Sequence, residues 1–158
     1  MGVGGTVLTL IAVLLPALVG TPHITMSTSA SIAGGATVKP GATVKLFVDV
    51  IPDAKIRVYA PGAKDYLPVV LELSKPPAGV RAGKLTYPPS QDWYFEPLKE
   101  HVPVYQAPFR LTQDVTIASS AKSGQSLTLQ GTFKYQACDD TICYNPVNAP
   151  VSWTINVK

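Results

Sequence analysis

Two long segments of strictly alternating apolar and polar residues flank the two cysteines of this chain. The apolar positions are Leu127, Leu129, Phe133 and Tyr135 in the first segment and Val151, Trp153, Ile155 and Val157 in the second. Because side chains alternate across a strand, this period of two predicts two β-strands with one buried face each. Two such segments joined by a polar connection predict an antiparallel hairpin. Cys138 then falls at the end of one arm and Cys143 in the loop.

Shorter strand-like segments recur through the chain, at 43–50, 56–59, 69–73 and 111–117. Turns rich in proline, glycine or polar residues separate them. No stretch of the globular part offers ten residues of apolar positions at helical spacing without a proline. We therefore predict an all-β protein, an immunoglobulin-like β-sandwich of about seven to nine antiparallel strands.

The first 33 residues are expected to lie outside this domain, which spans residues 37–158. A linker rich in Ser, Thr, Ala and Gly is expected at 27–37. No charged residue precedes Lys39, and residues 7–20 form an apolar run of 14 residues. That length is short for a membrane span but typical of a signal peptide, and small-residue cleavage sites follow at 28–30 and 31–33. Since no Lys or Arg precedes the run, a retained anchor that contacts the membrane and a buried apolar segment remain alternatives. Cleaved or retained as an anchor, the segment would place the domain in the periplasm or outside the cell, where cysteines can be oxidised.

The charges and histidines exclude several classes of function. The net charge is +3, and the Lys and Arg residues are scattered singly, so we expect no nucleic-acid partner. His23 and His101 lie far apart in the sequence, and the only methionines are Met1 and Met26, so neither a zinc nor a copper site is indicated. We expect no metal and no organic cofactor.

The cysteine pair supports two hypotheses. A bridge between Cys138 and Cys143 would close a loop worth only about 2 kcal/mol of stability, and a short bridge at the end of a hairpin is easily reached for exchange. Many secreted proteins nevertheless carry small structural bridges. Asp139 and Asp140 place negative charge beside Cys138 and would disfavour its thiolate.

An aromatic stretch, 93–98, lies in a proline-rich region before the second half of the domain. Its rings could close one end of the sandwich. Alternatively, the stretch covers the cysteine pair or contacts a partner, since exposed aromatic residues favour interfaces. The sequence leaves both hypotheses open.

The segment around the two cysteines resembles the cysteine motif of the N-terminal periplasmic domains of the thiol:disulfide interchange protein DsbD family. It comprises residues 135–146, Tyr-Gln-Ala-Cys-Asp-Asp-Thr-Ile-Cys-Tyr-Asn-Pro. Segments 52–59, 81–87 and 104–117 resemble other strands of that domain, so the resemblance covers roughly 37–158. It differs from the family in having one residue fewer between the cysteines and no aromatic residue at 96–98.

The resemblance implies an immunoglobulin-like domain that passes electrons from a membrane component to periplasmic thiol proteins through mixed disulfides. It implies that Cys143 engages partners and Cys138 resolves the mixed disulfide. It also implies a loop that covers the pair, corresponding here to the region of Glu96 and Leu98. Tyr59, Tyr135 and Tyr144 complete the set of residues expected near the partner or the cap.

The favoured hypothesis is an exported thiol-disulfide exchange domain with an oxidoreductase-type activity. Its partners would be thiol or disulfide proteins of the periplasm. Because the chain ends at Lys158, the electron donor would be a separate, membrane-borne protein. The alternative is a non-catalytic immunoglobulin-like binding or assembly module whose short disulfide is structural.

Overall fold

The computed structural model of the chain describes residues 21–32 and 37–158. The apolar run at 7–20, on which the expected signal peptide or anchor depends, lies outside the described residues. The described residues contain no helix, and so none that could cross a membrane. The prediction of an all-β protein is confirmed.

Eleven strands occur in the described residues, rather than the predicted seven to nine. They are β1 (Ile24–Ala30), β2 (Thr43–Pro52), β3 (Arg57–Tyr59), β4 (Val70–Leu73), β5 (Val80–Thr86), β6 (Gln91–Phe95), β7 (Glu100–Tyr105), β8 (Phe109–Ile117), β9 (Ser126–Tyr135), β10 (Ala137–Cys138) and β11 (Val147–Asn156). The additional strands lie in segments without clean alternation: β1 in the expected linker, β6 and β7 in the proline-rich region, and the two-residue β10.

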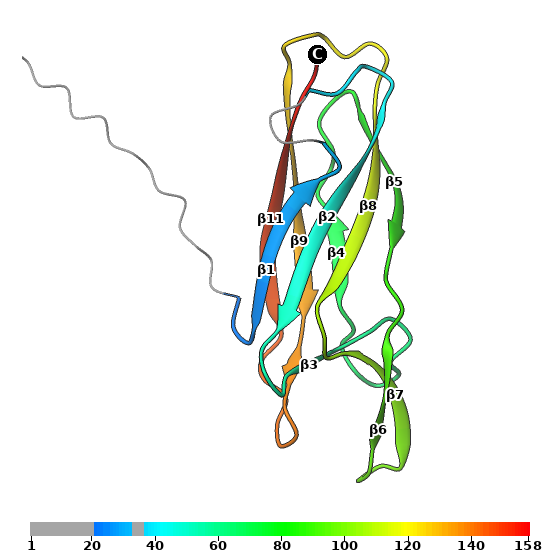
Figure 1. Ribbon diagram of the computed structural model, residues 1–158, viewed down its shortest axis with the longest axis vertical. Helices are drawn as coiled ribbons and strands as arrows, with labels where there is room; N and C mark the ends of the chain where they lie inside the picture. Colours follow the sequence, from blue (N-terminus) through cyan, green and yellow to red (C-terminus); the bar gives the residue numbers. More distant parts are fainter. Residues whose placement is uncertain (1–20, 33–36) are drawn as a thin grey trace, which may run out of the picture.

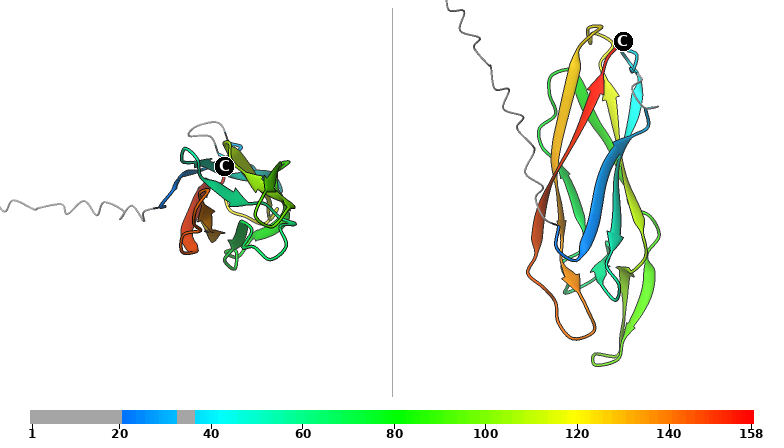
Figure 2. Two further views of the ribbon diagram at one scale, coloured as in Figure 1. Left: turned by 90° about the horizontal axis from the view of Figure 1, so that it is seen from below. Right: turned by 60° about the vertical axis from the view of Figure 1, so that its left-hand side comes forward.

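The strands form three antiparallel sheets, ordered β1-β2-β8-β5, β11-β9-β4 and β10-β3-β7-β6. The first two sheets face each other as the expected immunoglobulin-like sandwich, which is long and narrow (Figures 1 and 2). Alternate residues of each strand point inward, so the core between the sheets includes the fully buried Leu46, Leu111, Phe133 and Ile155. The third sheet lies at the lower end in Figure 1.

The predicted hairpin between the two alternating segments is confirmed. β9 and β11 pair antiparallel over ten residue pairs, from Tyr135 with Val147 to Ser126 with Asn156. The inward side chains of both strands pack in the core, because the matched alternation puts them on one face. The Trp153 indole Nε1 donates a hydrogen bond to the Phe47 carbonyl at 3.1 Å and so links the two sheets.

β1 replaces the linker expected from Ser27 onward. It pairs with β2 from Ile24 opposite Pro52 to Ala30 opposite Leu46, and it buries Ile24. Its Ser, Thr and Ala residues resemble a linker in composition, but an edge strand is held by backbone hydrogen bonds that any of these residues can make. The folded part therefore begins before residue 37.

Candidate functional site

The disulfide closes the loop that follows β9 and β10 at the lower end of Figure 1. Cys138 and Cys143 are bonded, with their Cα atoms 4.0 Å apart. The Asp139 amide donates to the Ile142 carbonyl at 3.0 Å, and the Tyr144 amide donates to the Ala137 carbonyl at 2.9 Å. The two cysteines thus face each other across a tight hairpin, whose first arm, β10, pairs with β3.

The two cysteines differ in exposure. Cys138 is 0% exposed and packs in a small cluster with Tyr59, Val102 and Val104. Cys143 is exposed. A thiol of another protein can therefore reach Cys143, whereas its approach to Cys138 is blocked by the cluster.

Asp139 shapes the loop between the cysteines. Its carboxylate accepts hydrogen bonds from the amides of Thr141, at 2.7 Å, and Ile142, at 2.8 Å, and from the hydroxyl of Tyr144, at 2.8 Å. These hydrogen bonds hold the pKa of Asp139 below its usual value, with the backbone amides as the largest cause, and the carboxylate raises the pKa of Tyr144. The Asp139 charge is therefore directed at the loop's own donors.

Arg57 is a buried cation beside the loop. Its side chain is 5% exposed. Its Nη1 donates to the Asp140 carboxylate at 2.9 Å, and its Nη2 donates to the Asp139 carbonyl at 2.6 Å. The guanidinium also lies over the Trp93 ring, 3.6 Å from the ring centre. The negative charge expected beside Cys138 is thus faced by a positive one.

Two stacked tyrosines also lie beside the bridge. The Tyr59 hydroxyl lies 3.8 Å from the Cys143 sulfur, and the Tyr59 ring stacks on Tyr66 with 4.2 Å between ring centres. The Tyr66 hydroxyl donates to the Glu100 carboxylate. Burial, chiefly, raises the pKa of Tyr59, and burial together with the Glu100 hydrogen bond raises the pKa of Tyr66 to about 12. Both phenols are therefore neutral at physiological pH.

The body of the β6–β7 hairpin packs against the buried cysteine. Trp93 joins the cluster around Cys138. Glu96 and Leu98, the expected cap residues, lie in the turn of the hairpin. Glu96 pairs with Lys99 at 3.1 Å, and Leu98 is 65% exposed. They lie in the turn at the far end of the hairpin, and within this hairpin Trp93, Val102 and Val104 are the residues that pack around Cys138.

Tyr135 and Tyr144 connect the loop to the start of the described chain. The Tyr135 hydroxyl donates to the Pro22 carbonyl at 2.8 Å, and burial, chiefly, raises its pKa to about 12. The Tyr144 ring stacks on His23, with 3.8 Å between ring centres. A cavity of about 490 Å³ lies here and is lined partly by His23, Asp53 and Tyr144. The segment before β1 therefore supports one flank of the disulfide loop.

Three residues beside the disulfide were not predicted as site residues from the sequence. Arg57 and Tyr66 were not singled out, and Trp93 was noted only as part of an aromatic stretch. Arg57 and Tyr59 are two positions apart in β3, so they share a face, and this is the one sequence signal that could have placed Arg57 beside the site.

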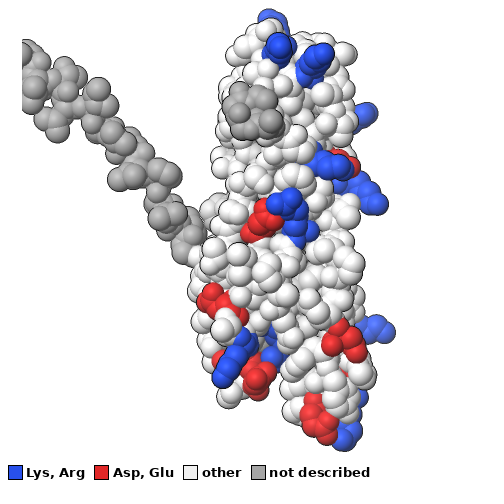
Figure 3. All heavy atoms as spheres, in the orientation of Figure 1, with Lys and Arg blue, Asp and Glu red and all other residues white. Residues whose placement is uncertain are grey.

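Acidic residues gather at the disulfide end. Figure 3 shows red side chains together with blue ones in its lower part, and blue ones without red at the top. The acidic residues of the disulfide end are Asp53, Asp65, Asp92, Glu96, Glu100, Asp139 and Asp140. At the other end, backbone hydrogen bonds of neighbouring residues bring Lys39, Lys122 and Lys158 together.

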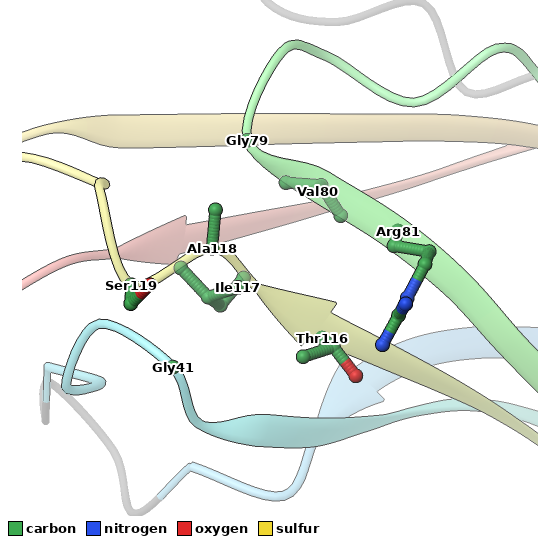
Figure 4. Close-up of a pocket in the computed structure, with 8 residues that line it drawn as sticks. All are labelled: Gly41, Gly79, Val80, Arg81, Thr116, Ile117, Ala118 and Ser119. Atoms are coloured by element: carbon green, nitrogen blue, oxygen red, sulfur yellow. The ribbon is translucent and has the colours of Figure 1, made fainter.

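A hollow of about 470 Å³ opens at that other end, where β8 ends and β5 begins (Figure 4). It is lined mostly by backbone and small side chains such as Gly41, Ala118 and Ser119, and Arg81 is the one charged residue among those that line it. It offers no carboxylate, imidazole or thiol. Elsewhere in residues 21–32 and 37–158, no three His, Cys, Asp or Glu side chains converge to hold a metal ion.

Comparison with known proteins gives one family and several structures. Residues 36–153 match the family described as "Thiol:disulfide interchange protein DsbD, N-terminal". None of the curated proteins matches the sequence. The N-terminal periplasmic domain of ScsB from Proteus mirabilis is similar in structure, with a TM-score of 0.55 and 10% identity over 87% of this chain. This chain spans 47% of that one, and the likeness shows the fold alone.

Two further solved structures have lower TM-scores. The N-terminal domain of DsbD from Neisseria meningitidis, in the reduced form, has a TM-score of 0.47 and 16% identity, over 77% of this chain and 82% of that one. The GAE domain of yeast GGA1 has a TM-score of 0.43 and 11% identity, over 86% and 95%.

Proposed function

The chain belongs to the family of DsbD N-terminal domains, and from this premise we propose that its Cys138–Cys143 pair exchanges disulfides with partner proteins. The observation that carries the proposal is the difference in exposure between the two sulfurs. Because Cys143 is exposed and Cys138 is buried, a partner thiol would attack Cys143, and Cys138 would act as the resolving thiol.

The exchange proceeds in two steps, each of which forms one disulfide bond and breaks another. A thiolate of a donor dithiol attacks the Cys143 sulfur, a mixed disulfide forms, the bond to Cys138 breaks, and the electron pair leaves on the Cys138 sulfur. The donor's second thiolate then attacks the donor sulfur of the mixed disulfide and releases Cys143. The donor is oxidised to a disulfide, and the domain gains two electrons and two protons. The same steps in reverse reduce an acceptor disulfide, with Cys138 resolving.

The surroundings of the pair fit these roles. Tyr59, Tyr66 and Trp93 pack around the inner sulfur, whereas Cys143 is exposed and its sulfur contacts the Tyr59 hydroxyl. Glu96 and Leu98 at the hairpin tip, with the exposed Ile142 in the loop, would contact a docked partner. Tyr135 and Tyr144 hold the loop from the side of the N-terminal segment. The scheme requires no metal or organic cofactor.

We place this activity in the periplasm. The partners would be periplasmic thiol or disulfide proteins, and electrons would come from a membrane-borne donor. Support comes from the family and from the similar ScsB domain, which is described as periplasmic.

Trapping with single-cysteine variants tests the proposal. In periplasmic extract, Cys138→Ser should accumulate a mixed disulfide through Cys143, because the resolving thiol is gone, whereas Cys143→Ser should trap little. Non-reducing gels detect the trapped species in both variants, and their disappearance on reduction is the control.

A redox titration provides a second measurement. The reduction potential of the wild-type pair should lie within the range of redox proteins, about −120 to −270 mV. A potential below about −300 mV, or equal absence of trapped species in both variants, would mean that the bridge is structural and the domain acts by binding.

A further inference from the structure

Arg57 has no part in the exchange scheme, although it lies beside the bridge. It is the direct cross-strand partner of Cys138 in the β10–β3 ladder. Residues opposite each other in an antiparallel pair share a face, with Cβ atoms about 4.5–5.5 Å apart. The Trp93 ring lies against the guanidinium and also packs beside the Cys138 cluster.

The burial of this cation is not explained by its visible partners. Removing a guanidinium from water is unfavourable unless charge and hydrogen bonds compensate. The Asp140 carboxylate that pairs with it is 79% exposed, so water screens that pair. Among the described residues, the Arg57 Nε is buried without a hydrogen-bond partner. A neutral donor could hold the Asp139 carbonyl without these disadvantages.

The exchange reaction creates a negative charge at this place. When Cys143 is attacked, the electron pair leaves on the Cys138 sulfur, which lies among Tyr59, Val102 and Val104. An apolar site disfavours a thiolate, whereas a cation nearby favours it. Asp140 pairs with Arg57 and Asp139 is held by loop donors, and Arg57 is the cation directly opposite Cys138 in the β10–β3 ladder.

We propose that Arg57 is a positioning residue that stabilises the departing Cys138 thiolate and thereby directs exchange through Cys143. This inference rests on the proposed exchange function and adds the residue that sets its rate. The leaving thiolate is better stabilised beside a cation, and a better-stabilised leaving group departs faster.

The test is the rate at which dithiothreitol reduces the oxidised protein at a fixed pH. Arg57→Gln should slow reduction about tenfold, because the charge is lost while a polar side chain remains. Arg57→Lys should keep most of the rate. Lys64→Gln removes an exposed cation at the same end and should change the rate less than about twofold. If Arg57 were only a brace, its loss would loosen the loop, so an unchanged or faster reduction of Arg57→Gln overturns the proposal.

Asp140→Asn provides a second test that does not disturb the core. It frees the guanidinium from its counter-ion, so reduction should become about threefold faster, and less so in the Arg57→Gln background. An unchanged or slower rate overturns the proposal even if Arg57→Gln does not fold. If wild-type protein neither exchanges nor traps a partner, the proposed function itself fails. If wild-type protein exchanges and the Arg57 variants match it, only the role of Arg57 fails.

Discussion

Among single side chains, Asp139 does the most to fix the shape of the disulfide loop. Its carboxylate satisfies two backbone amides and one hydroxyl within five residues of the chain. An ionised carboxylate accepts such hydrogen bonds better than a protonated one. The loop that presents Cys143 therefore depends on the charge state of Asp139.

We predict that the loop loses stability in acid. The folded pKa of Asp139 lies below its unfolded value, so its contribution is present above the unfolded value, near 3.8, and is lost as the pH falls through the lower folded value. Asp139→Asn should lower the unfolding free energy at pH 7 and remove this part of the acid dependence. Urea denaturation at pH 7, 5 and 3 measures both effects. Asp65→Asn, at an exposed position, is the matched control and should keep the wild-type pH profile.

The sequence was sufficient for some of these residues and not for others. The cysteines were found because alternating strands flank them, and their pairing follows from the hairpin. Arg57 was not predicted as a site residue. Periodicity assigns a side chain to one face of a strand, but it does not say which face of a short strand is buried by other elements. That cover comes from Trp93, which is distant in sequence and lies in a hairpin without clean alternation.

Among the strands, β1 carries the largest difference between expectation and structure. The region at 27–37 was expected to be a linker because it is rich in Ser, Thr, Ala and Gly. In the structure its backbone extends the sheet beside β2, and the Thr28 hydroxyl donates to the Ser152 carbonyl of β11 at 3.0 Å. The long alternating strands were predictable because packing depends on side chains. This edge strand was not, because its pairing depends mainly on backbone hydrogen bonds.

We predict that removal of β1 weakens the domain and its disulfide loop. A chain of residues 34–158 should unfold with about 3 kcal/mol less free energy than residues 21–158, because it loses the burial of Ile24 and the β1 hydrogen bonds. It should also be reduced faster by dithiothreitol, since the contacts of Pro22 and His23 with the loop are lost. Equal stability of the two chains would contradict a structural role for β1.

The same strand bears on where an exported protein would begin. Cleavage at 28–30 or 31–33 would cut through or behind β1, so we propose that the mature chain begins before Ile24. N-terminal sequencing of protein recovered from the periplasm measures this directly. A mature start after Ala30 would mean that the domain functions without β1.

Over the whole molecule, acidic and basic side chains are unevenly distributed along the long axis. Acidic residues outnumber the cations Lys55, Arg57, Lys64 and Lys99 at the cysteine end, whereas lysines gather at the other end (Figure 3). The sequence showed a modest net charge of +3 and scattered cations, and it gave no sign of this distribution, because the fold brings together residues that are distant in sequence. A field of this kind orients an approaching charged protein before contact.

We predict that partners approach the cysteine end with basic surroundings around their own reactive cysteine. The rate of exchange with a partner recovered through Cys138→Ser should then fall several-fold between about 20 and 300 mM salt, because salt screens the attraction over a shorter distance. Reduction by dithiothreitol, whose attacking thiolate carries a single charge, should depend on salt much less than the partner reaction, and this is the control for changes in the protein itself. Glu96→Lys, at the exposed tip of the β6–β7 hairpin, should slow the partner reaction at low salt and leave the dithiothreitol reaction unchanged. A partner rate that rises with salt would show that the acidic end repels its partner, and docking would then depend on apolar contacts such as that of Ile142.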